Sequence, residues 1–258
     1  MIGRFLGSEK VSFFLVLVLF VVLWELVVLI FPIRPYVLPG PGAVADAMWR
    51  EWRELLHHTL ATSVEIVLGF LLAAVVGFAG GALMFYYRWA DRLLSPPIVA
   101  FQNVPKVALA PIFVVWFGTT LTPRVLVAFV IAFFPVLVNT MVGLRATRKV
   151  SLEWVRSMGA TRWQTFVKVQ LPASLPTIFA GLRVATTLVV IGAVVGEYIA
   201  ANAGLGYLQL VATTNLDAPI LFASIIVMAV LGLILYEIVA FLEKVLLPWA
   251  KPPEDAAA

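Results

Sequence analysis

Six stretches of this chain are apolar for about twenty residues or more, and they constrain its fold more than any other feature. A helix that crosses a hydrocarbon core of about 30 Å needs roughly 20 mostly apolar residues. Membrane strands would alternate in ten-residue segments, and these stretches do not, so we expect helices. The predicted fold is an all-α integral membrane protein of about six transmembrane helices. The six windows are Val11–Phe31, Val64–Tyr87, Leu93–Phe117, Val125–Leu144, Ile178–Ala200 and Ile220–Leu242.

The composition supports a lipid-covered protein. Of all residues, 62% are hydrophobic and 12% are charged, whereas a soluble domain is about half apolar and a quarter charged. The chain has no cysteine, which excludes disulfides, thiolate metal sites and cysteine nucleophiles. Its two histidines, His57 and His58, are adjacent and point to different helical faces, so no metal site is expected. The first window has one charge, Glu25, and no small-residue cleavage site after it, so we expect a retained helix.

The basic residues predict the orientation. With the N-terminus in the cytoplasm, twelve basic residues face inward and four face outward, as the positive-inside rule requires. We therefore expect a multi-pass protein of the bacterial inner membrane with both termini in the cytoplasm. The inward set is Arg4, Lys10, Arg88, Arg92, Arg145, Arg148, Lys149, Arg156, Arg162, Lys168, Lys244 and Lys251, and the outward set is Arg34, Arg50, Arg53 and Arg124.

The chain divides into an N-terminal helix (1–31), an outer segment (32–58), a core of five spans (59–248) and a disordered tail (249–258). In the outer segment, apolar and charged residues alternate at helical spacing, which predicts an amphipathic helix at the membrane interface or on the protein. In the second span, Gly69, Gly77, Gly80 and Gly81 suit either close helix packing or a hinge. The core has one long inner loop, 145–172.

That loop predicts two short helices that meet at Gly159. Ser151 is a good N-cap residue, and Glu153 follows in the first turn, where the helix dipole favours an acid. Gly159 is placed to end the first helix. Thr161 followed by Gln164 is a capping-box pattern that opens a second helix, and we expect Pro172 to close it. Such a loop suits an anionic lipid surface or a groove on a partner protein.

The spacing within this loop resembles the docking motif of ABC-importer permeases. That motif is Glu-Ala-Ala, three residues, Gly, nine residues, an aliphatic residue, one residue and Leu-Pro. Here Glu153 stands six residues before Gly159, nine residues separate Gly159 from Val169, and Leu171-Pro172 follows after one more. The departure is Trp154-Val155 in place of Ala-Ala. The resemblance implies that the partner ATPase docks on Leu152, Glu153, Trp154, Val155, Arg156, Met158, Gly159, Ala160, Thr161, Leu171 and Pro172.

Other motifs extend the resemblance over roughly Pro35 to Pro248, to the nitrate/sulfonate/taurine-type branch of these permeases. They are Leu38-Pro39-Gly40-Pro41, Val104-Pro105 with Ala110-Pro111, Val115–Gly118, Phe133–Pro135 with Asn139-Thr140, and Gly192–Glu197 followed by Gly204–Tyr207. The resemblance implies a type I permease fold and two permease copies, here a homodimer. It also implies a separate ATPase that binds ATP and Mg, and an extracytoplasmic binding protein that delivers a small solute. The chain itself has no phosphate-binding loop, so we expect no ATP hydrolysis and no cofactor on it.

Ionisable residues inside membrane helices are costly and suggest function. Lys106 follows Pro105 near the middle of the third window, beside Gln102 and Asn103. It suits an anionic solute such as a sulfonate, nitrate, taurine or carboxylate. It equally suits a structural pair with Glu65 or Glu197, or snorkelling of the side chain. Glu197 suits gating, packing or solute contact, whereas Glu65 lies near a window end, where solvation is easy.

Two other classes of protein were weighed against the permease. A stand-alone secondary transporter predicts an internal repeat with interrupted helices in corresponding halves, and no such repeat is evident. Dependence of uptake on an ATPase partner discriminates the two. A membrane enzyme needs a convergent polar site, and the sequence contains no nucleophile–base grouping. The identity of the solute is left open, and the range includes vitamin precursors.

Overall fold

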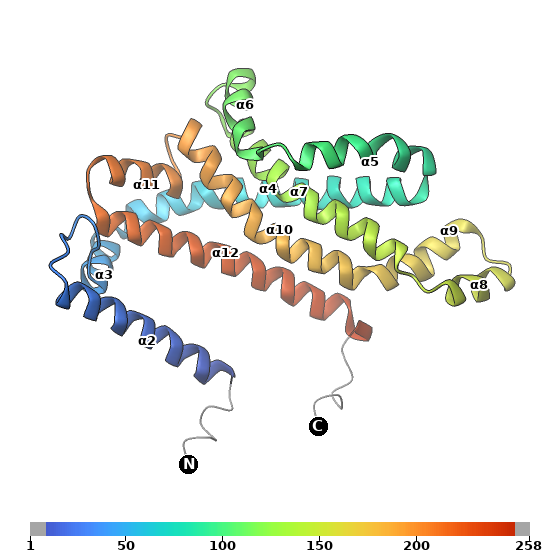
Figure 1. Ribbon diagram of the computed structural model, residues 1–258, viewed down its shortest axis with the longest axis horizontal. Helices are drawn as coiled ribbons and strands as arrows, with labels where there is room; N and C mark the ends of the chain where they lie inside the picture. Colours follow the sequence, from blue (N-terminus) through green and yellow to red (C-terminus); the bar gives the residue numbers. More distant parts are fainter. Residues whose placement is uncertain (1–8, 251–258) are drawn as a thin grey trace, which may run out of the picture.

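The computed structural model describes residues 9–250, with side chains described from Leu15 to Trp249. Every regular element in this part of the chain is helical (Figure 1). The elements are α2 (Glu9–Ile30), α3 (Pro41–Arg50), α4 (Trp52–Tyr86), α5 (Arg88–Gln102), η1 (Lys106–Leu109), α6 (Ala110–Phe117), α7 (Leu121–Arg145), α8 (Lys149–Ser157), α9 (Arg162–Thr165), the π-helical turn η2 (Phe166–Gln170), α10 (Leu171–Ala200), α11 (Leu205–Thr214), α12 (Ala218–Leu246) and η3 (Pro248–Ala250).

The centre of the bundle is formed by α4, α7 and α10, with α7 packed against both of the others (Figure 1). Small residues set the spacing. A Cβ added at Gly77 of α4 would lie 2.8 Å from the Val136 side chain, and one at Gly192 of α10 would lie 2.5 Å from Ala128 Cα. Since α4 continues without a break through its glycines, their role there is close packing, and the alternative of a hinge is not needed.

Within residues 9–250, four helical segments are long and apolar enough to cross a membrane without interruption: α4, α7, the continuous segment from α9 to α10, and α12. A fifth span arises if α5 and η1–α6 are counted together. The N-terminal helix α2 has 22 residues, of which the part with described side chains, Leu15–Ile30, is apolar but shorter than a full span. The prediction of a helical membrane protein is confirmed, and the helix count depends on these two segments.

The predicted third span, Leu93–Phe117, was wrong as a single helix. Between α5 and η1 the chain bends by 96°, so that α6 projects from the bundle at a steep angle to α5 (Figure 1). Pro105 caps η1 in an extended conformation, with ψ of 99°, and has no N–H to continue α5. Pro111 lies in the first turn of α6, where a missing N–H costs little.

The outer segment also differs from the prediction. Its amphipathic helix α3 ends at Arg50, and residues 52–58 already belong to α4 because only Glu51 interrupts the helical backbone. Val44 and Leu55 are buried in a second hydrophobic core against α11 and α12, so this segment lies on the protein. Trp49 stays 81% exposed.

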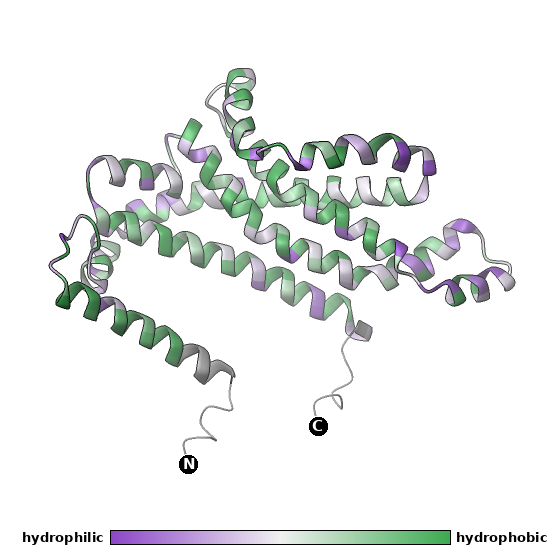
Figure 2. Cartoon of the chain, in the orientation of Figure 1, coloured by the Kyte–Doolittle hydropathy of each residue, from purple (hydrophilic) through white to green (hydrophobic). Residues whose placement is uncertain are grey.

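Polar residues gather at the end of the bundle that carries α8 and α9, while α2 and α12 are mostly apolar along their length (Figure 2). Both α2 and α12 have their chain-terminal ends directed towards the α8–α9 half of the molecule (Figure 1). The predicted disordered tail begins at residue 249. Residues 249–250 belong to η3, and the rest of the tail lies outside the described residues.

Candidate functional site

The inner loop contains a helical hairpin whose corner is Gly159, as predicted. Gly159 has φ of +81°, a conformation that costs glycine little, and its N–H donates to the Arg156 carbonyl at 3.0 Å. The first helix, α8, begins at Lys149, two residues before the predicted N-cap, Ser151. The prediction for Ser151 was wrong. The last non-helical residue before α8 is Arg148, with ψ of 127°, so Arg148 takes the N-cap position.

The second arm of the hairpin opens with the predicted capping box. The Gln164 N–H donates to Thr161 Oγ1 at 3.2 Å, and the Thr161 N–H donates to Gln164 Oε1 at 2.8 Å. Pro172 does not close this arm, contrary to prediction. The five-residue π-helical turn Phe166–Gln170 lies just before Pro172 and changes the backbone hydrogen-bond register. The helix therefore continues at the position where Pro172 has no N–H to donate to the carbonyl of residue 168.

As a result, the second arm is the start of a transmembrane helix. Helix runs from Arg162 to Ala200 over 39 residues, about 58 Å at 1.5 Å per residue. That length exceeds a hydrocarbon core of about 30 Å. A force applied to the hairpin near Gly159 therefore reaches the far end of α10 through one continuous element.

Among its polar residues, the hairpin exposes large apolar side chains. Trp154 is 70% exposed, Met158 75% and Trp163 64%, and α8 contains no buried residue. Leu152 and Val155 are half-buried. Exposed aromatic and Met side chains on a short helix are typical of a protein–protein contact surface.

A second group of functional side chains lies at the opposite end of the bundle, where α4, α7, α10 and α11 meet. Arg124 donates to the Glu65 carboxylate, and both side chains are buried. Thr62 Oγ1 donates to Glu197 Oε1 at 2.6 Å. We call Thr62, Glu65, Arg124 and Glu197 the outer polar network.

This network fixes the start of α11. The Leu205 N–H donates to Thr62 Oγ1 at 2.7 Å, and the Gly206 N–H donates to Glu197 Oε2 at 2.5 Å. The Gly204 N–H donates to His58 Nδ1 at 2.9 Å. A carboxylate at a helix N-terminus is favoured by the free N–H groups and the helix dipole. The bonds of Glu197 therefore suit packing of α11, one of the roles weighed for it from the sequence.

The ion pair was not found from the sequence. Glu65 and Arg124 are 59 positions apart, and Arg124 was counted only as an outward-facing basic residue. The expectation that Glu65 is solvated near a window end was wrong: its side chain is 0% exposed. The sequence signal was that Glu65 and Arg124 each lie near the end of a predicted apolar window, where a buried charge needs a partner of opposite charge.

Lys106 lies at the break between α5 and α6, together with Gln102 and Asn103. Its Nζ is 4.9 Å from the centroid of the Phe134 ring and 3.5 Å from the Gln102 carbonyl oxygen. Phe134 in turn stacks on Phe101 at 6.1 Å. Among the side chains of residues 15–249, no carboxylate lies within 4.0 Å of Lys106. The two acids considered as its partners bond elsewhere: Glu65 pairs with Arg124, and Glu197 accepts from Thr62. The interpretation of Lys106 as a partner for either acid is wrong.

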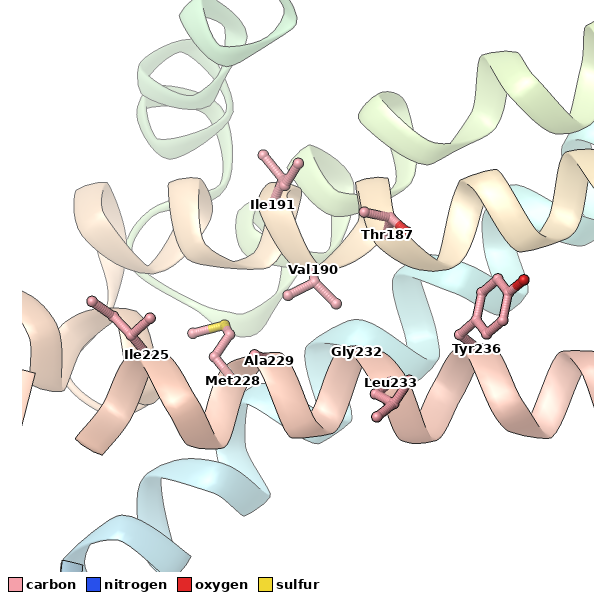
Figure 3. A pocket seen from close by; sticks show the side chains of 9 residues that line it. All are labelled: Thr187, Val190, Ile191, Ile225, Met228, Ala229, Gly232, Leu233 and Tyr236. Atoms are coloured by element: carbon pink, nitrogen blue, oxygen red, sulfur yellow. The ribbon is translucent and has the colours of Figure 1, made fainter. Parts of the chain in front are cut away.

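An apolar groove of about 460 Å³ runs between α10 and α12 (Figure 3). Val190, Met228 and Leu233 line it, with Thr187 and Tyr236 as its polar contributions. The groove includes none of the residues at the α5–α6 break. Its lining has no charged group that could recognise a charged solute.

Known proteins similar to this chain indicate which family has this combination of features. Residues 65–247 match the family model described as "Binding-protein-dependent transport system inner membrane component". The chain belongs to this family. It is therefore a multi-pass inner-membrane permease subunit of an ABC importer, a transport component and not a catalytic one.

Relatives agree over nearly the whole length. The chain is 39% identical to the formylaminopyrimidine transport permease protein ThiX of Halalkalibacterium halodurans, over 94% of this chain and 96% of that one. It is 37% identical to the riboflavin transport system permease protein RibX of Chloroflexus aurantiacus, over 90% and 88%. It is 31% identical to the putative aliphatic sulfonates transport permease protein SsuC of Escherichia coli, over 89% and 88%.

Among solved structures, an inward-facing conformation of the MetNI methionine ABC transporter matches with a TM-score of 0.61 at 22% identity. The match covers 80% of this chain and 99% of that one. At this level of identity the likeness supports the fold alone. The resemblance to ABC-importer permeases inferred from the motifs is thus confirmed, together with the type I importer fold.

Proposed function

We propose that two copies of this chain form the pathway of an ATP-driven importer and that a separate ATPase drives it through the α8–α9 hairpin. An extracytoplasmic binding protein delivers the solute to the end of the bundle that carries α3 and α11. Both termini lie in the cytoplasm. ATP and Mg are bound on the partner ATPase, and this chain binds neither.

The observation that carries this proposal is the hairpin itself. Its Trp154 and Met158 side chains are exposed, and its second arm is continuous with α10. Coupling needs an element with two discrete arrangements that both sites can bias. A helix that continues without interruption from a docking surface to the outer polar network connects two such sites. Closure of the ATPase dimer would move the two hairpins together, and α10 would carry the motion to the outer side.

Gly159 offers a direct test of coupling. A β-branched side chain is disfavoured at φ of +81°, so Gly159→Val should distort the corner and lower ATP-dependent uptake in proteoliposomes at least tenfold. No atom lies within 4 Å of a Cβ at this position, so the bundle should keep its thermal stability.

Gly42→Val is the matched control. Its Cβ also meets nothing within 4 Å, its φ is not positive, and it lies on α3 at the other end of the molecule. Uptake by this variant should stay near the wild-type rate. Equal uptake by the wild type and Gly159→Val would remove the hairpin from the coupling route, and uptake without any ATPase would favour a secondary transporter.

For the solute, we propose a small organic molecule with a flat aromatic ring and a partial or full negative charge, such as a vitamin precursor. Lys106 supplies a positive charge, and Phe101, which is 41% exposed and stacks on the buried Phe134, supplies a stacking surface at the α5–α6 break. Two of the similar relatives are named for formylaminopyrimidine and riboflavin, which are heteroaromatic. Gln102 and Asn103 lie at the same break and add polar groups for recognition.

The test is Lys106→Met, assayed by solute-stimulated ATPase activity of the reconstituted complex. We expect the solute concentration for half-maximal stimulation to rise about 10- to 150-fold, since a lost charge-assisted contact costs roughly 1.5–3 kcal/mol. Lys244→Met is the control, because Lys244 is exposed on α12. An unchanged half-maximal concentration in Lys106→Met excludes Lys106 from solute recognition while leaving the docking proposal intact.

A further inference from the structure

A cavity of about 920 Å³ lies between the α4–α5 turn and the α8–α9 hairpin, and it shares Arg156 and Ala160 with the docking residues expected from the sequence. Three arginines from three different helices line it: Arg88 at the start of α5, Arg156 on α8 and Arg162 on α9. Three arginines that line one cavity repel one another, so their positive charges favour an anion between them.

These arginines have no acidic partner in the part of the chain with described side chains. None of the ion pairs among residues 15–249 includes them, and the cavity lining contains no Asp or Glu. The nearest acid along α5, Asp91, is already bonded to Ser95 at 2.9 Å and to Arg145 at 2.8 Å. The charge of the cavity is thus complementary to an anion from outside the chain.

The other lining residues indicate which anion. Tyr86, Tyr87 and Trp89 form the rim and are 39%, 47% and 61% exposed. Exposed Tyr and Trp at the end of a membrane helix are typical of the headgroup region. Arginine binds phosphate through two parallel hydrogen bonds, and basic pockets at the cytoplasmic ends of membrane helices hold anionic headgroups.

We propose that this cavity is a phosphate-recognition site that holds the headgroup of an anionic phospholipid from the inner leaflet. Because Arg156 and Arg162 belong to the docking hairpin and Arg88 to the α4–α5 turn, a bound headgroup ties the hairpin to the bundle. The lipid would thereby set the resting position of the hairpin. This inference rests on the cytoplasmic placement of the hairpin proposed above.

The experiment uses the full-length permease in lipid nanodiscs, without the ATPase. Nanodiscs of phosphatidylcholine receive increasing phosphatidylglycerol, and lipid retained by the purified protein is counted by native mass spectrometry. The wild type should retain phosphatidylglycerol selectively. Replacement of any one of the three arginines by glutamine should weaken phosphatidylglycerol retention about fivefold. The triple variant Arg88→Gln/Arg156→Gln/Arg162→Gln should retain the least phosphatidylglycerol. Arg148→Gln, an exposed arginine outside the cavity, should bind like the wild type.

Several outcomes would overturn the proposal. One is equal retention by the triple variant and the wild type. Another is full occupancy by inorganic phosphate with no preference for phosphatidylglycerol, which assigns the site to a soluble anion. If lipid retention is unchanged and the triple variant, mixed with the ATPase in a second assay, fails to assemble with it, the cavity is part of the ATPase contact. Since uptake is not measured, these results are independent of the Gly159→Val test.

Discussion

The two ends of this permease are stabilised in opposite ways. At the outer end, four helices share a buried network in which Thr62, Glu65, Arg124 and Glu197 bond one another or the backbone of α11. At the other end, α8 buries no residue. A buried charge network tolerates little rearrangement, whereas an exposed hairpin can adapt to a partner.

The difference indicates where movement can begin. The outer network holds α11 onto α4 and α10, so opening of that end requires several bonds to break together. The hairpin is connected to the same α10 by an unbroken helix. In the transport cycle proposed above, α10 would carry movement of the hairpin to the end that resists opening.

The largest effect on stability is expected from Arg124→Met. Removal of one partner leaves Glu65 as a buried carboxylate without its cation, which costs about 3–5 kcal/mol. Thermal unfolding of the purified permease should show a large drop in Tm, and adding Glu65→Gln should restore part of it. Arg145→Met is the control, because the Arg145–Asp91 pair is at the surface and contributes about 0–1 kcal/mol. Equal effects of the two arginine variants would show that the outer end is no more tightly held.

A smaller effect is expected from Thr62→Val. The change removes the donor to Glu197 and the acceptor of the Leu205 N–H, at a cost of about 1–3 kcal/mol. Hydrogen exchange should become faster at Leu205. Thr59→Val is the control, because the Thr59 hydroxyl bonds only the Leu55 carbonyl of its own helix. Unchanged exchange at Leu205 in Thr62→Val would mean that α11 is held by packing alone.

Local features of the hairpin could be predicted because they depend on neighbours in sequence. The Thr161–Gln164 capping box and the positive φ of Gly159 follow from residue type and spacing. Four of the six apolar windows likewise located the four uninterrupted spans among the described residues. By contrast, the 96° bend after α5 depends on what α6 packs against, and proline alone does not set its direction.

The outer polar network could not be predicted because its four side chains come from three helices, α4, α7 and α10, and they bond the backbone of a fourth, α11. A pair such as Glu65 and Arg124, 59 positions apart, is joined only by the way α4 packs on α7. The continuity of α9 with α10 was missed for a different reason. Pro172 usually signals a helix end, and the preceding π-helical turn overrides that signal.

The smallest effect on stability, and the largest on assembly, is expected at Trp154. Because the chain has no native cysteine, Trp154→Cys and Trp49→Cys give single thiols on exposed short helices at opposite ends. The decisive measurement is the yield of a short thiol–amine cross-link from each to the ATPase in the assembled complex. We predict an ATPase adduct from Trp154→Cys and none from Trp49→Cys. Equal yields, or no adduct from Trp154→Cys in a complex that retains its ATPase, would contradict docking at the hairpin.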